Sequence, residues 1–592
     1  MAKAPVLLTG LLVGLGAATG CSHDAAMRDI DRRVAQLISE SNEATNLSVR
    51  PEFGSAAGNI DDDDLYRERP GTVNPRAAEL NLRARIDADA DAVIQRLDAY
   101  AVEPAAALEL DLPRAMDVAT ENSREYIFQE EEYILAALRL LVERHRWGPR
   151  FFDDVSATVS ANPDDGSYDT ALRIVNELGV TQRLPYGGSV SASLLARATE
   201  DLHRRVSGEN VQSAELLLTA NVPLLRGSGQ VARESRIQAE RELIYAARDF
   251  ERFRREFLFT IADDFLSLVV QKRRISISEA QVESFRRVES QQIALYEGGR
   301  ATPFDADEAR NETLDAIDSL NDARESFRLS KDRFKVRLGL PTDRAIVIIE
   351  DAFELPVPAS TLDEAVVAAM TYRLDLQTRR DRVDDRRRSL LVARDELRPD
   401  LNLTGRLSLP TDPSRDRSGL QFEPDETDLT LGVTFGLPLD REIERLGVRQ
   451  AEISLARSER EFDRFRDEVA IAVRAAVRGI DSATFSLQIQ ETNVEIAEQR
   501  KAAIDADPAG ANIRQTTDAI NAIARARSSR DDARRNLEIA ILSFLRDTGQ
   551  LRVGTDGMIA AIPGGGDRGN RGDRGDSGTP DGEAAPSGTP GG

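Results

Sequence analysis

The sequence predicts an elongated, mainly α-helical protein with a small antiparallel β part. The same set of elements occurs twice in tandem along the chain. Three observations support this prediction: proline-free helical stretches over 229–297 and 441–505, four segments that alternate apolar and polar residues, and landmarks that recur in the same order at a nearly constant spacing. The chain has 592 residues, 30% of them charged, and a mean hydropathy of −0.39. Long helices with solvated faces fit these values better than one large globular core.

Composition argues against nucleic-acid binding and against an enzymatic or metal site. The net charge is −24, and Lys and Arg alternate with acidic residues instead of forming the basic patches that phosphate binding requires. The chain has one Cys and three His, and it contains neither a phosphate-binding glycine loop with its Lys nor paired metal-ligand spacings. We therefore expect no enzyme activity, no cofactor, no metal and no nucleic-acid partner.

The N-terminus predicts export. Lys3 precedes an apolar stretch over residues 6–18 that is too short to span a bilayer and that ends in ATGCS. Residues 1–20 resemble a bacterial lipoprotein signal peptide, although Ala18 stands where such signals more often have Leu. The resemblance implies cleavage before Cys21, acylation of that cysteine, and sorting to outer membrane lipid, in which the acyl chains are buried. An ordinary signal peptide with an incidental cysteine is the alternative.

The two ends of the chain contribute little to a core. Residues 21–107 mix an acidic run, prolines and one short helical stretch at 86–100, so we expect a partly disordered extension. Residues 552–592 are rich in Gly, Pro, Asp and Arg and have almost nothing to bury, so we expect a disordered tail.

Landmarks in the central part recur at a nearly constant distance. FERFRREF, which begins at Phe250, returns as FDRFRDEV, which begins at Phe462, and Gly339 matches Gly549 at almost the same shift. A period this long indicates tandem domains rather than a solenoid of short repeats. We therefore predict an internal duplication. The two repeats are assigned to residues 108–340 and 341–551.

Each repeat contains two segments that alternate apolar and polar residues. The four predicted strands cover residues 189–199, 214–223, 400–409 and 428–439. A period of two over about ten residues, with apolar side chains on one face, is typical of a tilted strand that crosses a bilayer. A strand of a soluble two-sheet sandwich is the alternative, but the remaining segments are helical and offer no second sheet.

A long helix follows each pair of strands, over residues 229–297 and 441–505. At about 1.5 Å per residue, each helix reaches roughly 100 Å. Apolar residues in the first of them, from Phe250 to Leu268, step by three and four along a narrow seam, which indicates another helix as the packing partner.

Each long helix ends at a glycine-bearing tip, over residues 296–303 and 507–512, and a shorter helix returns. The return helices are predicted over residues 303–338 and 513–545. They cover only about half of the way back. Residues 113–147 and 361–398 could fill the remainder, because two shorter helices stacked end to end match one long helix in length.

The order of strand pair, long helix, glycine tip and half-length return helix, from about residue 110 to 551, resembles the TolC-like outer membrane efflux proteins. Three motifs support the resemblance together, although none is decisive alone: GGRATPFDADEARNETLDAIDSLNDARESFRLSKDRFKVRLGLP from Gly298, YRLDLQTRRD from Tyr372 and LRPDLNLTG from Leu397. Leu374 stands where that family usually has Pro. Residues 148–184 form an apparent insertion, which either adds strands or makes a side subdomain.

Four strands from one chain leave two open edges, which hydrocarbon does not tolerate, so the chain must oligomerise. The resemblance implies a homotrimer with a shared 12-stranded barrel in the outer membrane of a diderm bacterium and a 12-helix tunnel in the periplasm. It also implies a passive exit duct for efflux or secretion, fed by an inner-membrane transporter through a periplasmic adaptor protein. A structural coiled-coil envelope lipoprotein without transport activity is the alternative, but it does not need the strands.

The helical tips are the first candidate site. They lie farthest from the membrane and combine glycine with small residues that allow close helix approach, so we predict adaptor docking there; simple turn chemistry is the alternative. The docking residues are Gly298, Gly299, Arg300, Ala301, Gly510 and Ala511.

A pore constriction is the second candidate site. The resemblance implies that Asp518 faces inward and narrows the periplasmic mouth as a ring of carboxylates. Gln515 occupies the neighbouring position that often carries Asp, and Asp305 is its counterpart in the first repeat. Such a ring favours cations, because like charges held close create a negative potential. The alternative is that Asp518 only stabilises a helix N-terminus.

Overall fold

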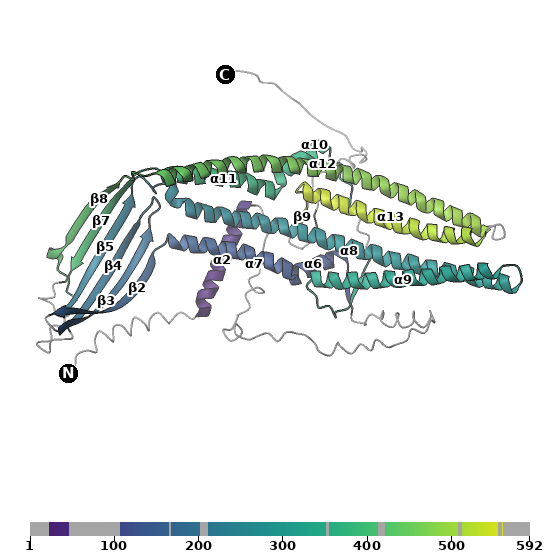
Figure 1. The fold of residues 1–592 in the computed structure, drawn as a ribbon, viewed down its shortest axis with the longest axis horizontal. Helices are drawn as coiled ribbons and strands as arrows, with labels where there is room; N and C mark the ends of the chain where they lie inside the picture. Colours follow the sequence, from purple (N-terminus) through teal and green to yellow (C-terminus); the bar gives the residue numbers. More distant parts are fainter. Residues whose placement is uncertain are drawn as a thin grey trace, which may run out of the picture.

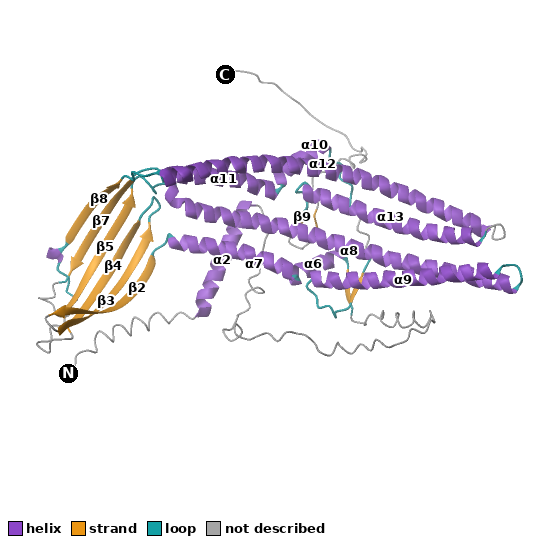
Figure 2. Cartoon of the chain, in the orientation of Figure 1, coloured by secondary structure: helices purple, strands orange, loops and turns teal. Residues whose placement is uncertain are grey.

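The computed structural model describes residues 23–45, 107–164, 167–201, 211–350, 355–411, 421–506, 512–553 and 559–560. A six-stranded sheet stands at one end, and long helices run away from it side by side (Figure 1). Figure 2 shows the same division, with the large sheet at one end and helices along the remaining length.

Several sequence predictions lie outside the described residues. They are the signal peptide, Cys21, the helical stretch 86–100, the tip residues Gly510 and Ala511, and the tail from residue 561 onward. Part of the predicted extension is described as helix α2 (His23–Thr45). Its buried side chains, among them Leu37 and Ile38, pack against Tyr133 and Phe250 of the helical layer.

The sheet is an antiparallel meander. Its strands, in spatial order, are β2 (Arg150–Asp164), β3 (Ser167–Arg183), β4 (Ser189–Asp201), β5 (Val211–Pro223), β7 (Asp400–Pro410) and β8 (Asp428–Gly436). Among the described residues, β2 and β8 therefore each have a hydrogen-bonded neighbour on one side only.

The prediction of four strands per chain was wrong. The insertion 148–184 forms the hairpin β2–β3, and β3 pairs with the whole length of β4, from Ala171 opposite Asp201 to Arg183 opposite Ser189. This continuous register extends the sheet instead of forming a side subdomain. The twelve strands predicted for a trimer depended on four strands per chain, so that count no longer follows.

The register places apolar side chains on one face across the whole sheet. One complete row runs over all six strands: Phe151, Val180, Ala192, Leu218, Leu407 and Leu429. The opposite face is more polar. There Glu215 of β5 accepts hydrogen bonds from Arg197 of β4 and from Ser408 of β7, at 3.0 and 2.7 Å. The alternation in the sequence therefore corresponds to one apolar and one polar face of the sheet.

The long and return helices lie close to their predicted bounds. The long helices are α8 (Glu234–Glu297) and α12 (Glu442–Ala506), and the return helices are α9 (Pro303–Arg337) and α13 (Ile513–Asp547). Helix α8 begins later than predicted because Val231–Arg233 forms a 3-10 turn, η2. The two return helices have the same length, 35 residues, and both begin with a capping box.

The remaining helical stretches are each split into two helices. The first pair is α6 (Leu112–Asn122) and α7 (Arg124–Arg146), and the second is α10 (Leu362–Tyr372) and α11 (Leu374–Asp395). Each break is a single extended residue, Ser123 or Arg373, with ψ of 124° or 116°. An extended residue cannot continue the helical hydrogen-bond ladder, so the predicted single segments become stacked pairs.

The C-terminal end of a return helix packs against each of these breaks. Helices α9 and α13 end in Schellman motifs whose positive-φ residues are Gly339 and Gly549. A Cβ on Gly339 would lie 1.9 Å from the carbonyl oxygen of Asn122, and a Cβ on Gly549 would lie 2.9 Å from the carbonyl carbon of Tyr372. Glycine is therefore needed for conformation and for space at both equivalent joints.

The helices form a layer with two open sides. Near the sheet the order is α7, α8, α11, α12, and near the tips it is α9, α8, α13, α12. The largest apolar core lies at the joints between these two halves and includes Ile261, Phe334 and Leu542. Beside it, β1 (Leu108–Leu110) pairs in parallel with β6 (Ile346–Ile348), which ties the beginnings of the two repeats together.

The structure also contains a few minor elements. They are the 3-10 turn η3 (Pro424–Glu426), which precedes β8, and the short antiparallel pair β9 (Arg552–Val553) and β10 (Ile559–Ala560).

Candidate functional site

The α8–α9 tip is a tightly closed turn at the end of the molecule remote from the sheet (Figure 1). Arg300 N donates to Leu295 O at 2.8 Å and Gly299 N donates to Tyr296 O at 2.9 Å, which is a Schellman motif with Gly299 at φ +66°. No atom lies within 4 Å of the position of a Cβ on Gly299. The tip therefore exposes backbone and small side chains, and the exposed rings of Tyr296 and Phe304 flank it.

Asp305 and Gln515 hold the same local role in the two return helices. Asp305 Oδ2 accepts from Thr302 N at 3.0 Å, and Thr302 Oγ1 accepts from Asp305 N at 3.2 Å. Gln515 forms the same reciprocal pair with Asn512, at 3.2 and 2.9 Å. The hydrogen bonds from Thr302 hold the pKa of Asp305 below its usual value. Both side chains therefore take part in capping boxes. The spacing of Thr302 and Asp305 is the sequence pattern of such a box.

Asp518 is exposed and lies one turn farther along α13. It approaches a group of carboxylates on the neighbouring helix α9, where burial and the charges of Asp315, Glu308 and Asp518 raise the pKa of Glu312. A hydrogen bond from Asn521 opposes this shift. The structure therefore places Asp518 close enough to Glu312 of the neighbouring helix for its charge to act on that carboxyl. Sequence reasoning missed Glu312, because the proximity depends on the packing of α9 beside α13.

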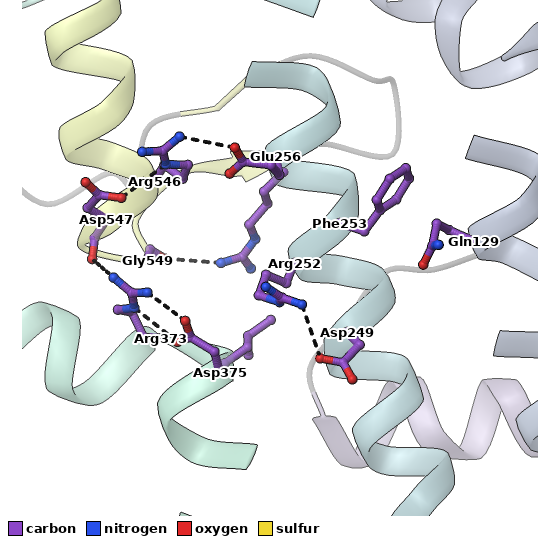
Figure 3. A pocket seen from close by; sticks show the side chains of 12 residues that line it. Gln129, Asp249, Arg252, Phe253, Glu256, Arg373, Asp375, Arg546, Asp547 and Gly549 are labelled. Carbon is purple, nitrogen blue, oxygen red and sulfur yellow. Dashed lines mark hydrogen bonds and ion pairs between the residues drawn. The ribbon is translucent and has the colours of Figure 1, made fainter. Parts of the chain in front are cut away.

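A pocket of about 710 Å³ lies where α8 meets the second repeat (Figure 3). Arg373 donates to both carboxylate oxygens of Asp375, at 3.0 and 2.6 Å, and to Asp547 O at 3.3 Å. Burial alone raises the pKa of Asp375, but the hydrogen bonds and charge of Arg373 outweigh it, so the net shift is downward. From the other side Arg546 donates to Glu256 Oε1 at 3.2 Å. These partners all belong to the chain itself, so the pocket is a polar joint between the repeats.

The two open sides of the helical layer carry apolar stripes. On α12, at about 100° per residue, exposed Ile453 lies on roughly the opposite side of the helix from buried Val469 and Val473. On α7 the exposed stripe is heptad-spaced and consists of Phe128, Leu135 and Val142. Exposed Leu314, Leu329 and Val336 continue this side along α9. Each outer helix is therefore apolar both toward its own chain and away from it.

No protein-family model and no curated protein matches the sequence. Solved structures do match the fold. A membrane protein from Pseudomonas aeruginosa aligns with a TM-score of 0.57 and 16% identity, over 74% of this chain and 93% of that one. The outer membrane protein VceC from Vibrio cholerae aligns with a TM-score of 0.57 and 15% identity, over 74% and 96%. The outer-membrane channel OprN aligns with a TM-score of 0.56 and 15% identity, over 74% and 89%.

The chain has the TolC-like fold. The alignments cover 74% of this chain and 89–96% of these structures, so nearly the whole of their architecture is matched. Within this TolC-like chain, no three His, Cys, Asp or Glu side chains of the described residues are grouped so as to hold a metal ion. None of the described helices is long and apolar enough to cross a lipid bilayer.

Proposed function

We propose that the protein is the outer-membrane channel-tunnel of a tripartite efflux or secretion system. In this proposal three copies form a passive exit duct, which receives its substrate from an inner-membrane transporter through a periplasmic adaptor protein. The solved structures that share the fold are described as outer membrane channels or membrane proteins rather than as enzymes, which supports a transport role without catalysis.

One observation carries this proposal. The chain presents two open sides, both in the sheet and in the helical layer: α7, α9 and β2 lie on one, and α12 and β8 on the other. A surface that fits the opposite side of an identical copy produces a ring when the rotation between copies closes. Three copies of a four-helix layer would give a twelve-helix tunnel, as in the proposed homotrimer.

The apolar face of the sheet supports placement in the outer membrane. Strands β7 and β8, with 11 and 9 residues, have the length of tilted membrane-spanning strands, and the apolar row crosses every strand. Acylation of Cys21 would add a second attachment to the same membrane, because buried methylene groups contribute about 0.8 kcal/mol each.

Internal duplication belongs to the same proposal. The equal lengths of α9 and α13, their matched capping boxes and their matched C-terminal Schellman glycines support an origin from one repeated unit. Helices α6 and α10, which begin at Leu112 and Leu362, are farther apart in the sequence than the return helices, which begin at Pro303 and Ile513. The β2–β3 hairpin with its flanking turns, present in the first repeat only, accounts for most of this difference.

Conductance across planar lipid bilayers tests the proposed function. Purified protein should be trimeric in detergent by light scattering and should open ion-conducting channels of uniform size without any nucleotide. A correctly folded oligomer that never conducts would contradict the duct and would favour the structural envelope lipoprotein instead.

A further inference from the structure

We propose that the β2–β3 hairpin is part of the membrane wall and that β2 of one copy pairs with β8 of the next, so that the trimer closes an 18-stranded barrel. The inference rests on the proposed trimeric channel. It adds to the proposed function which strands pair between neighbouring copies and how wide the exit through the membrane is.

The sheet is continuous from the hairpin into β4. β3 is paired with β4 along the whole of β4, and its apolar side chains stay in register with those of β4, for example Leu178 opposite Leu194. The hairpin therefore extends the same apolar face, with Phe151, Val155 and Val159 of β2 exposed on it. A subdomain lying beside the barrel would break this register or turn its apolar side chains toward protein.

A charged side chain interrupts this apolar face at a level that fits a membrane boundary. Asp153 lies opposite Leu178, within the first few residues of β2 next to the helices. Asn176 of β3 donates to Asp153 Oδ1 at 2.7 Å, so the two polar groups satisfy each other. A charged side chain on the lipid-facing side of a strand costs little near the interface and much more at the bilayer centre.

The edge strand β8 lacks the residues that usually protect a free edge. It contains no Pro and no Lys or Arg, and its only charged residue is Asp428 at its first position. Natural proteins protect a free edge with charges, prolines or bulges, so an edge without protection is suited to pairing. Among the described strands, β2 and β8 are the two that end the sheet. Six antiparallel strands per copy leave β2 and β8 running in opposite directions, so the seam continues the antiparallel pattern.

An 18-stranded barrel and a twelve-helix tunnel match in width. With strands about 4.8 Å apart and tilted by about 40°, a barrel measures about 2 Å in mean diameter per strand, so 12 strands give about 24 Å and 18 give about 36 Å. Twelve helices spaced about 9.5 Å apart make a ring of about 36 Å. Eighteen strands therefore continue the tunnel at the same width, whereas twelve would constrict it. The exit at the membrane then has room for a water-filled lumen.

Cysteine crosslinking at the seam tests the proposal in the full-length protein. Thr430→Cys on the lumen face of β8 is combined in turn with Asp154→Cys, Ser156→Cys or Thr158→Cys on the lumen face of β2, and a short bifunctional thiol reagent is added. At least one pair should convert monomers into covalent trimers on denaturing gels. The parent protein, with Cys21 only, and the pair Val155→Cys with Thr430→Cys, whose side chains lie on opposite faces, should stay monomeric.

The alternative barrel has its own signature. If the hairpin lay outside the wall, β4 of one copy would pair with β8 of the next, and Ser191→Cys, Ser193→Cys or Arg197→Cys would crosslink to Thr430→Cys in place of the β2 positions. That result, or trimers with no crosslink from any β2 position, would overturn the 18-stranded barrel while leaving the channel intact. Protein that is monomeric by light scattering in detergent would instead overturn the proposed trimer and the barrel with it.

Discussion

Gly339 lies at the joint between α9 and the α6–α7 break, where the structure has no room for a side chain. Gly339→Ala should destabilise the protein strongly, because φ of +76° disfavours a Cβ and the added atom would meet the carbonyl oxygen of Asn122 at 1.9 Å. The left-handed conformation alone costs about 1–2 kcal/mol, and overpacking adds about 1–3 kcal/mol. Gly299→Ala is the matched control, since φ is +66° but space is open. The Tm should fall clearly more for Gly339→Ala; equal losses would contradict the joint.

Glu312 should make stability depend on pH. Its folded-state pKa is raised, so its favourable contribution is present below about pH 4 and is lost as pH rises through the folded-state pKa. Glu312→Gln removes the cost of burying a charged carboxylate and, with it, the repulsion from Asp315, Glu308 and Asp518. The variant should therefore have a higher Tm than the parent at pH 7 and the same Tm at pH 4. If Asp518 is a main source, the gain should shrink in an Asp518→Asn background; a gain independent of pH would refute the mechanism.

Asp518 also bears on ion selectivity in the proposed pore. If three copies place it around the periplasmic mouth, Asp518→Asn should lower cation selectivity and weaken block by trivalent cations, because the ring loses its negative potential. Reversal potentials in asymmetric salt measure this directly. Asp305→Asn is the informative comparison, since that carboxylate is engaged with Thr302. Unchanged selectivity in a trimeric, conducting Asp518→Asn variant would remove Asp518 from the pore.

At the scale of elements, most helices and four of the strands could be predicted because their signals are local. Proline-free runs, glycine-bearing tips and a period of two or of three to four residues predict α8, α9, β4 and β8 closely. The β2–β3 hairpin stayed ambiguous, because Asp153 and Asn176 interrupt its alternation and only pairing with β4 resolves the face. The breaks at Ser123 and Arg373 carry no Gly or Pro, and the approach of Gly339 and Gly549 explains them only in three dimensions.

The candidate sites show the same limit. The capping boxes of Asp305 and Gln515 follow a local sequence spacing, although we predicted a pore role for both residues instead. The proximity of Glu312 to Asp518 depends on how α9 and α13 lie beside each other. The stripe Phe128, Leu135 and Val142 has a visible heptad spacing, but only the order of the helices in the layer shows that it is exposed.

The α8–α9 tip is the element on which adaptor docking depends. It lies at the end remote from the sheet, and Gly299 leaves the backbone open to close approach. A cysteine at Arg300 should therefore crosslink to the adaptor in intact cells far more efficiently than a cysteine at exposed Ser276, which lies farther from the tip on α8, inside the layer rather than at an open side. Immunoblotting for the adaptor after crosslinking measures the yield. Equal capture from both positions would contradict docking at the tip.

At the scale of the whole molecule, exposed apolar residues on the two open sides of the helical layer lie at matching distances from the sheet. Helix α7 ends at Arg146 and helix α12 begins at Glu442. Leu135 lies as many residues before Arg146 as Ile453 lies after Glu442. The same is true of Val142 and Leu446. All four side chains are exposed in the single chain. When α12 of one copy lies beside α7 of the next, each pair meets at the same distance from the sheet, which is the geometry of a coiled-coil seam.

A charge placed in this seam should therefore break the trimer and be rescued from the facing helix. Ile453→Asp should reduce the trimeric fraction in detergent while helix content stays unchanged, because the residue is exposed within its own chain and an unpaired carboxylate would be buried only between copies. Adding Leu135→Lys should restore trimers, because the two introduced side chains can form an ion pair. Adding Leu135→Asp instead should not restore them, because it places a second carboxylate beside the one introduced by Ile453→Asp. Light scattering and circular dichroism measure the two properties. Rescue by both second changes, or by neither, would mean that α7 does not face α12 of the next copy at this level.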